Sequence, residues 1–520
     1  MPSNPLKFLW ADWRQRLPYR RYYDREDRPR RLRAQFFCLL TLLSGAVYLA
    51  WLAQQAYQVH ALHTYLFLFT ELSAYTLLFA MSLDVWQRRY HRPEGIEPDA
   101  PFSVDVFVTS CGESLEIIQA TLAAIQKLNY SHYTVYVLDD AGKDAVLDVC
   151  RSFGFHYLSR PRQGIPQLDA KSGNLNFGLS QSHGDIILVQ DADQIPHPDI
   201  ISRLIGFFRL PRVAYVQSRQ AFLLPDGDPF YNRDDVFYET IQLSNDQVNA
   251  VISCGSGVLY RRQALKEIGG FTTWNLVEDF TTSYELVSRG WQGIYFPYAL
   301  SRGLAPDTLQ GVYQQRYQWC LDTMRLFFWD NPFRKSGLSF SQRLHFSLTM
   351  MAYIISGLIL PIFFLLPLYC YFTGKTFLVE QEWNYLSLRG IYLLCTILAF
   401  RYLFFKNDSL KQFKMLCGLF PVYALGVFSA MWYPPGHKPR YKVNHLIRFK
   451  PLQNFFYILP HLSIITLHLS LPFLSLALGW AAPRLIAANA FFSAFTIWVL
   501  GEMIILALSR PKWTAPNLPD

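Results

Sequence analysis

The sequence predicts an α/β domain inserted between α-helical membrane segments. Between residues 101 and 330, short strand patterns alternate with helix patterns, which argues for a mostly parallel sheet with helices on both faces. On both sides of that region lie apolar runs long enough to span a bilayer. The 520 residues, of which 51% are hydrophobic, are sufficient for a soluble domain of ordinary size plus membrane-embedded parts.

Residues 1–35 form a basic segment ahead of two expected spans within residues 36–83. Much of the net charge of +9 arises from arginines between positions 14 and 33. A nucleic-acid-binding tract is one interpretation of such a run. Because an apolar stretch follows at once, a cytoplasmic flank under the positive-inside rule is simpler, and we expect no nucleic-acid partner. A second basic flank, residues 87–92, indicates that the following domain is cytoplasmic as well.

The elements of the α/β region are expected in a regular order after a Pro/Glu linker at residues 93–101. They are a strand at 104–109, an amphipathic helix at 115–128, a strand at 134–138, a helix, a strand at 155–158, the segment around Lys171, and a strand at 186–189. The last strand is a short β-branched run after a glycine, which is typical of a buried parallel strand.

Residues 331–508 form an expected C-terminal membrane region with about four spans. These lie at 346–372, 386–405, 456–480 and 485–508, and Arg389 and Arg401 lie close enough to the ends of the second to snorkel. Residues 413–433 are also apolar. If they crossed the membrane, the basic loop 436–450 would face outside, so we expect an interfacial or re-entrant segment there and six spans in total.

Acidic residues follow two of the predicted strands. Asp139 and Asp140 come after one, and Asp191 and Asp193 after another. In a parallel sheet the carboxyl ends of strands share one edge, where ligands of open α/β sheets bind. So much negative charge repels itself unless a divalent cation and a bound nucleotide compensate it. Each motif alone is also compatible with a turn, solvated or capping a helix.

Four further features fall outside the strands. Lys171 adds a cation, although a surface lysine at a helix start is the simpler interpretation. The glycines of Gly255-Ser256-Gly257 allow close backbone approach to a ligand or form a turn before a strand. Asp279 opens a helix, where an acid favours the helix dipole or serves as a general base. Trp319, on a helix before the first C-terminal span, is an interfacial anchor or stacks on a sugar.

The ordered set of these motifs resembles the processive family-2 glycosyltransferases of the cellulose synthase type. The set is Asp-Asp-x-Gly, Ala-Lys-x-Gly-Asn, Asp-x-Asp, Gly-Ser-Gly, Glu-Asp and Gln-x-x-x-Trp, and it covers roughly Ser103 to Trp319. The resemblance implies a GT-A-type, Rossmann-like cytoplasmic domain in a multi-pass protein of the cell membrane. It also implies an inverting β-glycosyltransferase that polymerises a polysaccharide, a β-glucan such as cellulose, from a UDP-sugar such as UDP-glucose, with Mg²⁺ or Mn²⁺. The same resemblance implies that the product is translocated across the membrane. It leaves room for an accessory subunit.

The resemblance assigns a role to each candidate residue. The donor-binding residues are Asp139, Asp140, Lys171 and Asp191, the metal ligands are Asp191 and Asp193, the catalytic base is Asp279, and the acceptor-binding residues are Gln315 and Trp319. The loop from Tyr441 to Asn444 resembles the gating loop over the active site. No domain is expected after Leu508, where bacterial cellulose synthases carry a cyclic-di-GMP receptor.

Three positions depart from the family pattern. Val277 and Asn444 stand where threonine is usual, and Gln318 stands where arginine is usual. Because that arginine lies near the nucleotide diphosphate in the family, Gln318 leaves a charge unsupplied. Arg316 points about 200° around the helix from position 318 and cannot simply replace it. Two alternatives stay open: transfer of one sugar to a polyprenyl phosphate, and a non-catalytic degenerate subunit.

Overall fold

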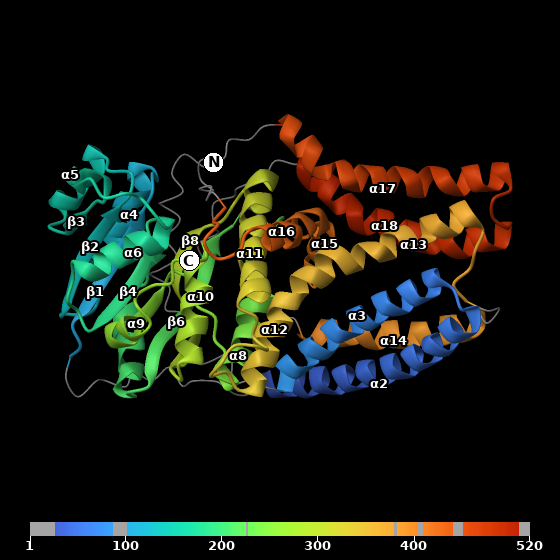
Figure 1. Ribbon diagram of the computed structural model, residues 1–520, viewed down its shortest axis with the longest axis horizontal. Helices are drawn as coiled ribbons and strands as arrows, with labels where there is room; N and C mark the ends of the chain where they lie inside the picture. The colour runs from blue at the N-terminus through green and yellow to red at the C-terminus, as the bar shows by residue number, and fades with distance from the viewer. Residues whose placement is uncertain are drawn as a thin grey trace, which may run out of the picture.

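The computed structural model describes residues 27–86, 101–224, 227–378, 382–403, 409–439 and 451–508. Most of the basic N-terminal segment, most of the linker 93–101 and the gating-like segment 441–444 lie outside these residues. In the described part, the α/β domain occupies one end of the molecule and the long apolar helices the other (Figure 1).

An eight-stranded sheet forms the centre of the α/β domain. Its strands are β1 (Val104–Ser110), β2 (Tyr133–Asp139), β3 (His156–Leu158), β4 (Ile186–Asp191), β5 (Gln194–Pro196), β6 (Val213–Leu223), β7 (Val258–Arg261) and β8 (Gln292–Leu304). Their order across the sheet is β3-β2-β1-β4-β7-β6-β8-β5. The first four are parallel as predicted, but β7 is antiparallel to both β4 and β6. The sheet is therefore mixed, because the second half of the domain adds strands that the sequence patterns did not reveal.

The register places the predicted acids at one edge of the sheet. Ser110, at the end of β1, pairs with Asp139 of β2, and Thr109 pairs with Asp191 of β4. The carboxyl ends of β2 and β4 therefore lie on either side of β1, as parallel pairing predicts.

Strand β4 is buried on both faces, which its unbroken apolar run predicts. Ile187 and Val189 belong to one hydrophobic core, whereas Ile186 and Leu188 belong to the core on the opposite face. Helices cover both faces, as predicted. The helical segments of this domain are α4 (Leu115–Ile125), α5 (Asp144–Ser152), η1 (Pro161–Gln163), α6 (Ala170–Ser180), α7 (Ile200–Leu204), η2 (Ile205–Arg209), η3 (Phe237–Ile241), α8 (Gln242–Gln247), α9 (Arg262–Glu267) and α10 (Glu278–Ser288).

Helix α11 (Leu309–Trp329) lies between the sheet and the apolar helices (Figure 1). Its N-terminus is fixed by Thr308, whose side chain accepts a hydrogen bond from the backbone N–H of Gly311. The predicted acceptor motif therefore stands on a rigid element next to the membrane region.

Six of the described helical segments are long and apolar enough to cross a membrane, and they coincide with the six predicted ranges. They are formed by α2 (Asp27–Val59), α3 (Leu62–Trp86), the run of α12 (Phe340–Ile354), η4 (Ile355–Ile359) and α13 (Leu360–Thr373), then α14 (Glu382–Leu403), α17 (Pro451–Leu478) and α18 (Pro483–Leu508). The apolar segment 413–433 is split into α15 (Ser409–Gly418) and α16 (Phe420–Trp432), which are bent by 50° relative to each other.

Arg389 of α14 does not serve as a snorkelling residue at a helix end, in contrast to the sequence-based expectation. It forms an ion pair with the buried Glu71 of α3, and its guanidinium lies over the rings of Tyr48 and Tyr392 at 5.2 and 5.6 Å from their centroids. The hydropathy pattern of the sequence could not reveal this pair, because Glu71 and Arg389 are 318 residues apart. Buried charges inside an apolar bundle are retained where they are paired in this way.

Candidate active site

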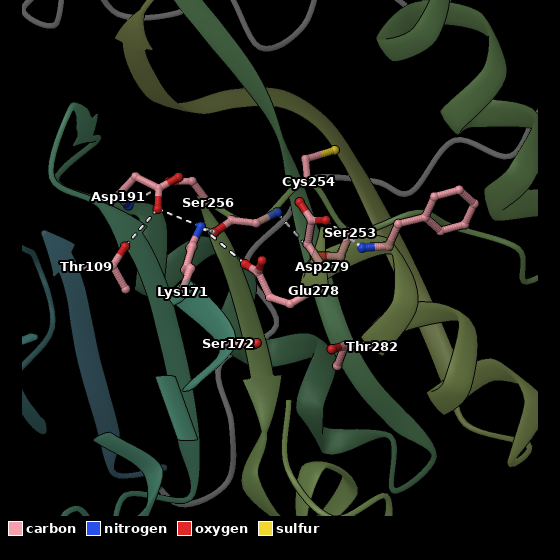
Figure 2. A network of polar contacts seen from close by, with 12 residues as sticks. Thr109, Lys171, Ser172, Asp191, Ser253, Cys254, Ser256, Glu278, Asp279 and Thr282 are labelled. Carbon is pink, nitrogen blue, oxygen red and sulfur yellow. Dashed lines mark hydrogen bonds and ion pairs between the residues drawn. The ribbon is translucent and has the colours of Figure 1, made fainter. Parts of the chain in front are cut away.

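The ammonium of Lys171 lies among acids that β4 and α10 bring together (Figure 2). Its Nζ is 2.6 Å from Asp191 Oδ1 and 3.5 Å from Glu278 Oε1, and it donates to the Gly255 carbonyl at 2.8 Å. Burial alone would lower the pKa of Lys171, but Asp191 and Glu278 outweigh burial and raise that pKa. Lys171 is therefore a permanent positive charge between two acidic segments.

The backbone ahead of Lys171 adopts a strained conformation. Asp169 and Ala170 have φ values of 66° and 45°, the left-handed region that residues with a Cβ rarely adopt. Arg160 stabilises this turn by donating to the carbonyls of Leu168 and Ala170 at 2.6 and 2.9 Å. Strain of this kind gathers at functional sites, where the surrounding structure holds it in place.

Asp191 and Asp193 are the predicted metal ligands. The Oδ1 atom of Asp191 accepts a hydrogen bond from Thr109 at 2.8 Å in addition to the Lys171 ion pair. Burial, together with the charges of Asp191 and Glu113, raises the pKa of Asp193 to about 7. Lys171 balances one negative charge at this edge of the sheet, and carboxylate oxygens are the hard ligands that fit a divalent cation. Within the described residues, no group of three or more acidic, histidine or cysteine side chains could hold a metal.

Gly255 is required by the close packing of the site. Its φ is +76°, and a Cβ at this position would lie 2.7 Å from Asp279 Oδ2 and 3.1 Å from Lys171 Nζ. Any side chain here would displace the two groups predicted to bind the donor and to act as the base. The glycine pair thus forms a bend directly before β7, and approach of its backbone to a ligand stays a prediction.

Asp279, the predicted base, lies in the first turn of α10, where its Oδ1 accepts from the Phe280 backbone N–H at 2.7 Å. Burial and the neighbouring Glu278 raise the pKa of Asp279 to about 8, while Lys171 opposes the shift. A carboxylate with such a pKa is suited to accept a proton near neutral pH. Val277, just before the helix, forms no side-chain cap, so the helix start lacks the hydrogen bond that a threonine could supply there.

The two acids after β2 have different environments. Asp140 forms a buried bidentate ion pair with Arg160, at 2.9 Å from Nε and 2.5 Å from Nη2. Asp139 is fully buried and accepts from the backbone N–H groups of Ala141 and Lys143 and from the hydroxyl of Tyr157. The backbone contacts of Asp139 form the turn into α5, and Arg160 links Asp140 to the turn before α6. The roles of Asp139 and Asp140 in donor binding stay predictions.

Gln315 and Trp319, the predicted acceptor-binding residues, are partly exposed on α11. The guanidinium of Arg316 lies 4.7 Å from the centroid of the Trp319 ring and forms an ion pair with Asp234 at 3.0 Å. Arg316 therefore fixes the orientation of the indole. Its charge is paired with Asp234, so it does not replace an arginine at position 318.

Gln318, which replaces the family arginine, points away from solvent into the helix packing. Its side-chain amide donates to the carboxylate of Asp322, which is fully buried and lies 3.6 Å from Arg325. Arg325 in turn donates to the side chain of Asn275 and to the backbone carbonyl of Tyr433. Burial raises the pKa of Asp322 to about 7 in spite of these partners.

We expect Gln318→Arg to leave turnover within about twofold of the parent. The new guanidinium lies beside the buried carboxylate of Asp322, whose raised pKa shows that Arg325 compensates its charge only in part. The guanidinium is therefore expected to pair with Asp322 rather than with a bound diphosphate. Turnover measured as UDP release checks this result. An increase of tenfold or more would mean that the guanidinium reaches the donor instead and that Asp322 does not retain it.

Three residues of the site were assigned no role from the sequence, although Glu278 belongs to the Glu-Asp motif. Arg160 holds Asp140 and the turn before α6, Glu278 approaches Lys171, and Lys438, from the basic loop, forms an ion pair with Asp169. Each contact joins segments far apart in the chain, and none follows a spacing rule. The adjacency of Glu278 to Asp279 was the only signal that singled out any of the three.

Two known families match the chain. "Glycosyltransferase like family 2" matches residues 100–321, and "Cellulose synthase" matches residues 266–409. The cellulose synthase catalytic subunit (UDP-forming) of Pseudomonas fluorescens (strain SBW25) is 32% identical over 266 residues, which cover 49% of this chain and 36% of that protein. Cellulose synthase 1 of Komagataeibacter xylinus is 29% identical over 344 residues, which cover 62% of this chain and 22% of that protein. The chain thus spans about a third or less of the length of these relatives.

A solved structure supports the fold. The mannosyltransferase PcManGT from Pyrobaculum calidifontis, in complex with GDP-Man and Mn²⁺, has a TM-score of 0.52 and 17% sequence identity, and the match covers 72% of this chain and 99% of that one. The α/β domain therefore has the GT-A-like glycosyltransferase fold. The chain carries a glycosyltransferase family 2 domain and a cellulose synthase domain, and it is a homologue of bacterial cellulose synthase catalytic subunits.

Proposed function

We propose that this protein is a membrane-bound inverting glycosyltransferase that elongates a β-linked polysaccharide from a UDP-sugar, with UDP-glucose as the expected donor. The observation that carries the proposal is the position of Lys171. It contacts Asp191, an expected donor-side acid, and Glu278, the neighbour of the expected base, so the two halves of a transfer site meet at one ammonium.

The proposed chemistry needs one base. An acceptor hydroxyl gives its proton to the carboxylate of Asp279, and its oxygen forms a bond to the anomeric carbon as the bond to UDP breaks. A single displacement converts an α-linked donor into a β-linked product, so no covalent intermediate on the protein is required. Trp319, held by Arg316, supplies a flat apolar surface against which an acceptor sugar can stack.

The donor diphosphate and a magnesium or manganese ion are the expected ligands of the edge formed by Asp191 and Asp193. When bound, such an ion neutralises charge on the departing UDP. Mg²⁺ is typically held by one or two carboxylates together with substrate phosphates, which suits a site with two protein acids. Lys171 balances Asp191 and orients it through the 2.6 Å contact.

We also propose that α15 and α16 enter the membrane and return to the side of the α/β domain, which is expected to be cytoplasmic. Near the start of α15, Lys411 donates to backbone carbonyls of Gly227 and Asp228. Beyond α16, Lys438 pairs with Asp169. Both ends of the α15–α16 pair thus contact the α/β domain, which supports a re-entrant pair. The protein would then have six spans, in agreement with the positive-inside rule.

A cysteine placed at Gly436 is expected to react with a membrane-impermeant maleimide from the side on which the α/β domain lies. Residue 436 is exposed and two positions from Lys438. Lys375→Cys, in the exposed segment after α13, is the matched control and should react from the opposite side. The test uses inside-out and right-side-out vesicles with Cys111 and Cys395 replaced by serine. Labelling of both cysteines from the same side would contradict the re-entrant topology.

The function is tested by supplying the purified protein with individual radiolabelled UDP-sugars in the presence of Mg²⁺ or Mn²⁺. We expect one of them to give an ethanol-insoluble polymer. Label that appears only in an organic extract would identify transfer to a polyprenyl phosphate instead. If no sugar is transferred and UDP does not bind, the protein is not a UDP-sugar transferase.

A further inference from the structure

Glu278 has no role in the proposed chemistry so far, although it lies at the centre of the site. Glu278 as a whole is 5% exposed, whereas Asp279 beside it is partly exposed. A buried carboxylate without a cation is costly to the folded protein, and Lys171 lies 3.5 Å from its Oε1 atom. Glu278 thus depends on Lys171 for its charge balance.

Lys171 in turn is held from two sides. Asp191 binds it from the end of β4, and Glu278 approaches it from the start of α10 (Figure 2). Its third contact is the hydrogen bond that it donates to the Gly255 carbonyl. The ammonium is therefore a single positive charge shared by two acidic segments of the site, the end of β4 and the start of α10. The balance between this ammonium and the carboxylates of Glu278 and Asp191 determines the net negative charge around Asp279.

We propose that Glu278 is a positioning residue for the transfer reaction: its buried carboxylate, held beside Asp279 by the ion pair with Lys171, adds negative charge around that base. This inference rests on the proposed function, because it assigns Glu278 to the same site. A role in charge balance accounts for the buried Glu278 directly before the base. The helix dipole alone would be served by one acid in the first turn of α10.

The groups around Asp279 come from four segments. Glu278 precedes it on α10, Lys171 faces it from α6, Asp191 faces it from β4, and the thiol of Cys254 lies near it in the segment before β7. Of the charged groups, Glu278 contributes most to raising the pKa of Asp279, after burial, and Lys171 contributes most to lowering it. Removing the charge of Glu278 should therefore ease the loss of the proton from Asp279.

The test is the pH dependence of kcat/KM for the UDP-sugar, which reports the base in the free enzyme. The parent is expected to show a rate that rises with pH and reaches half its plateau near pH 8. In Glu278→Gln the midpoint should move down by at least about half a pH unit, because a like charge next to the base has been removed. Glu278→Asp keeps the charge and should keep the midpoint near that of the parent.

Glu285→Gln is the matched control. Glu285 lies on the same helix but pairs with Lys335 and Arg289, away from the site, so its removal should leave the midpoint in place. UDP affinity, measured by calorimetry with Mn²⁺, should stay within about threefold in Glu278→Gln, since Lys171 keeps its contact with Asp191. An unmoved midpoint in Glu278→Gln, or an equal shift in Glu278→Asp, would overturn the proposal.

A second readout keeps the inference testable without turnover. Carbodiimide modifies protonated carboxyl groups, so labelling of Asp279 in the full-length protein, followed by mass spectrometry from pH 5 to 9, reports its protonation directly. We expect the midpoint of labelling to fall in Glu278→Gln, and coincident curves would overturn the proposal. If the parent neither binds UDP nor transfers sugar, the proposed function fails, while the labelling curves still decide the role of Glu278.

Discussion

Replacement of Asp279 by asparagine is expected to lower kcat for sugar transfer by about 1,000-fold or more, within the usual range for a general base that acts at the reacting hydroxyl. The amide has nearly the shape of the carboxylate but cannot accept the proton. Because Asp191 and Lys171 are untouched, UDP affinity should change by less than about threefold. Initial rates with the radiolabelled donor, alongside calorimetry with UDP, measure both effects. Asp148→Asn, an exposed acid on α5, is the control and should retain the parent rate.

The same substitution is expected to stabilise the fold. The pKa of Asp279 is raised to about 8 by burial and Glu278, so the folded protein favours the protonated form. That contribution to stability is fully present below about pH 4, the ordinary pKa of an aspartate, and is lost as the pH rises through 8. Asparagine cannot ionise, so Asp279→Asn should raise Tm at pH 8.5 by at least about 2 °C and change it little at pH 4. A lower Tm at pH 8.5 would mean that the charged form of Asp279 stabilises the fold and that its pKa is not raised.

Removal of either carboxylate after β4 is expected to weaken donor binding. In Asp191→Asn or Asp193→Asn, affinity for UDP in the presence of Mn²⁺ should fall by at least about tenfold, because a hard cation loses one of two charged oxygen ligands. The dependence of binding on Mn²⁺ should weaken in parallel. Calorimetric titration of UDP at fixed Mn²⁺ concentrations measures both quantities without turnover.

Asp199→Asn is the matched control for these two substitutions. Asp199 lies just beyond β5 and pairs with Arg203 on the surface of the domain, so its removal should leave UDP affinity unchanged. Equal affinities in Asp191→Asn, Asp193→Asn and the parent would place the diphosphate elsewhere in the domain.

The parts of the fold that follow from local patterns were predictable. Strand β4 combines an unbroken apolar run with a following Asp-Ala-Asp, so both its burial and the acids at its end follow from the sequence. The apolar segments likewise gave the positions of six long helices. The antiparallel pairing of β7 was not predicted, because Val258–Arg261 is a four-residue stretch whose pairing with β4 and β6 depends on the whole sheet.

The candidate site was predictable in its members but not in its contacts. Motif order suggested that Lys171, Asp191 and Asp279 belong together, and the structure brings Lys171 into contact with Asp191 and places Asp279 beside Gly255. Nothing in the sequence indicated that Arg160 pairs with Asp140. Ion pairs between distant segments depend on tertiary packing, which has no period or spacing in the chain.

The most direct test of the central claim is the fate of label from UDP-glucose, supplied with Mg²⁺ or Mn²⁺ to the purified parent and to Asp279→Asn. The account predicts that the parent releases UDP and forms an insoluble polymer that a linkage-specific β-glucanase digests, and that Asp279→Asn forms almost none. An Asp279→Asn variant that makes as much polymer as the parent would contradict the assignment of the base. A parent that transfers sugar from no UDP-sugar, to polymer or to lipid, would contradict the transferase itself.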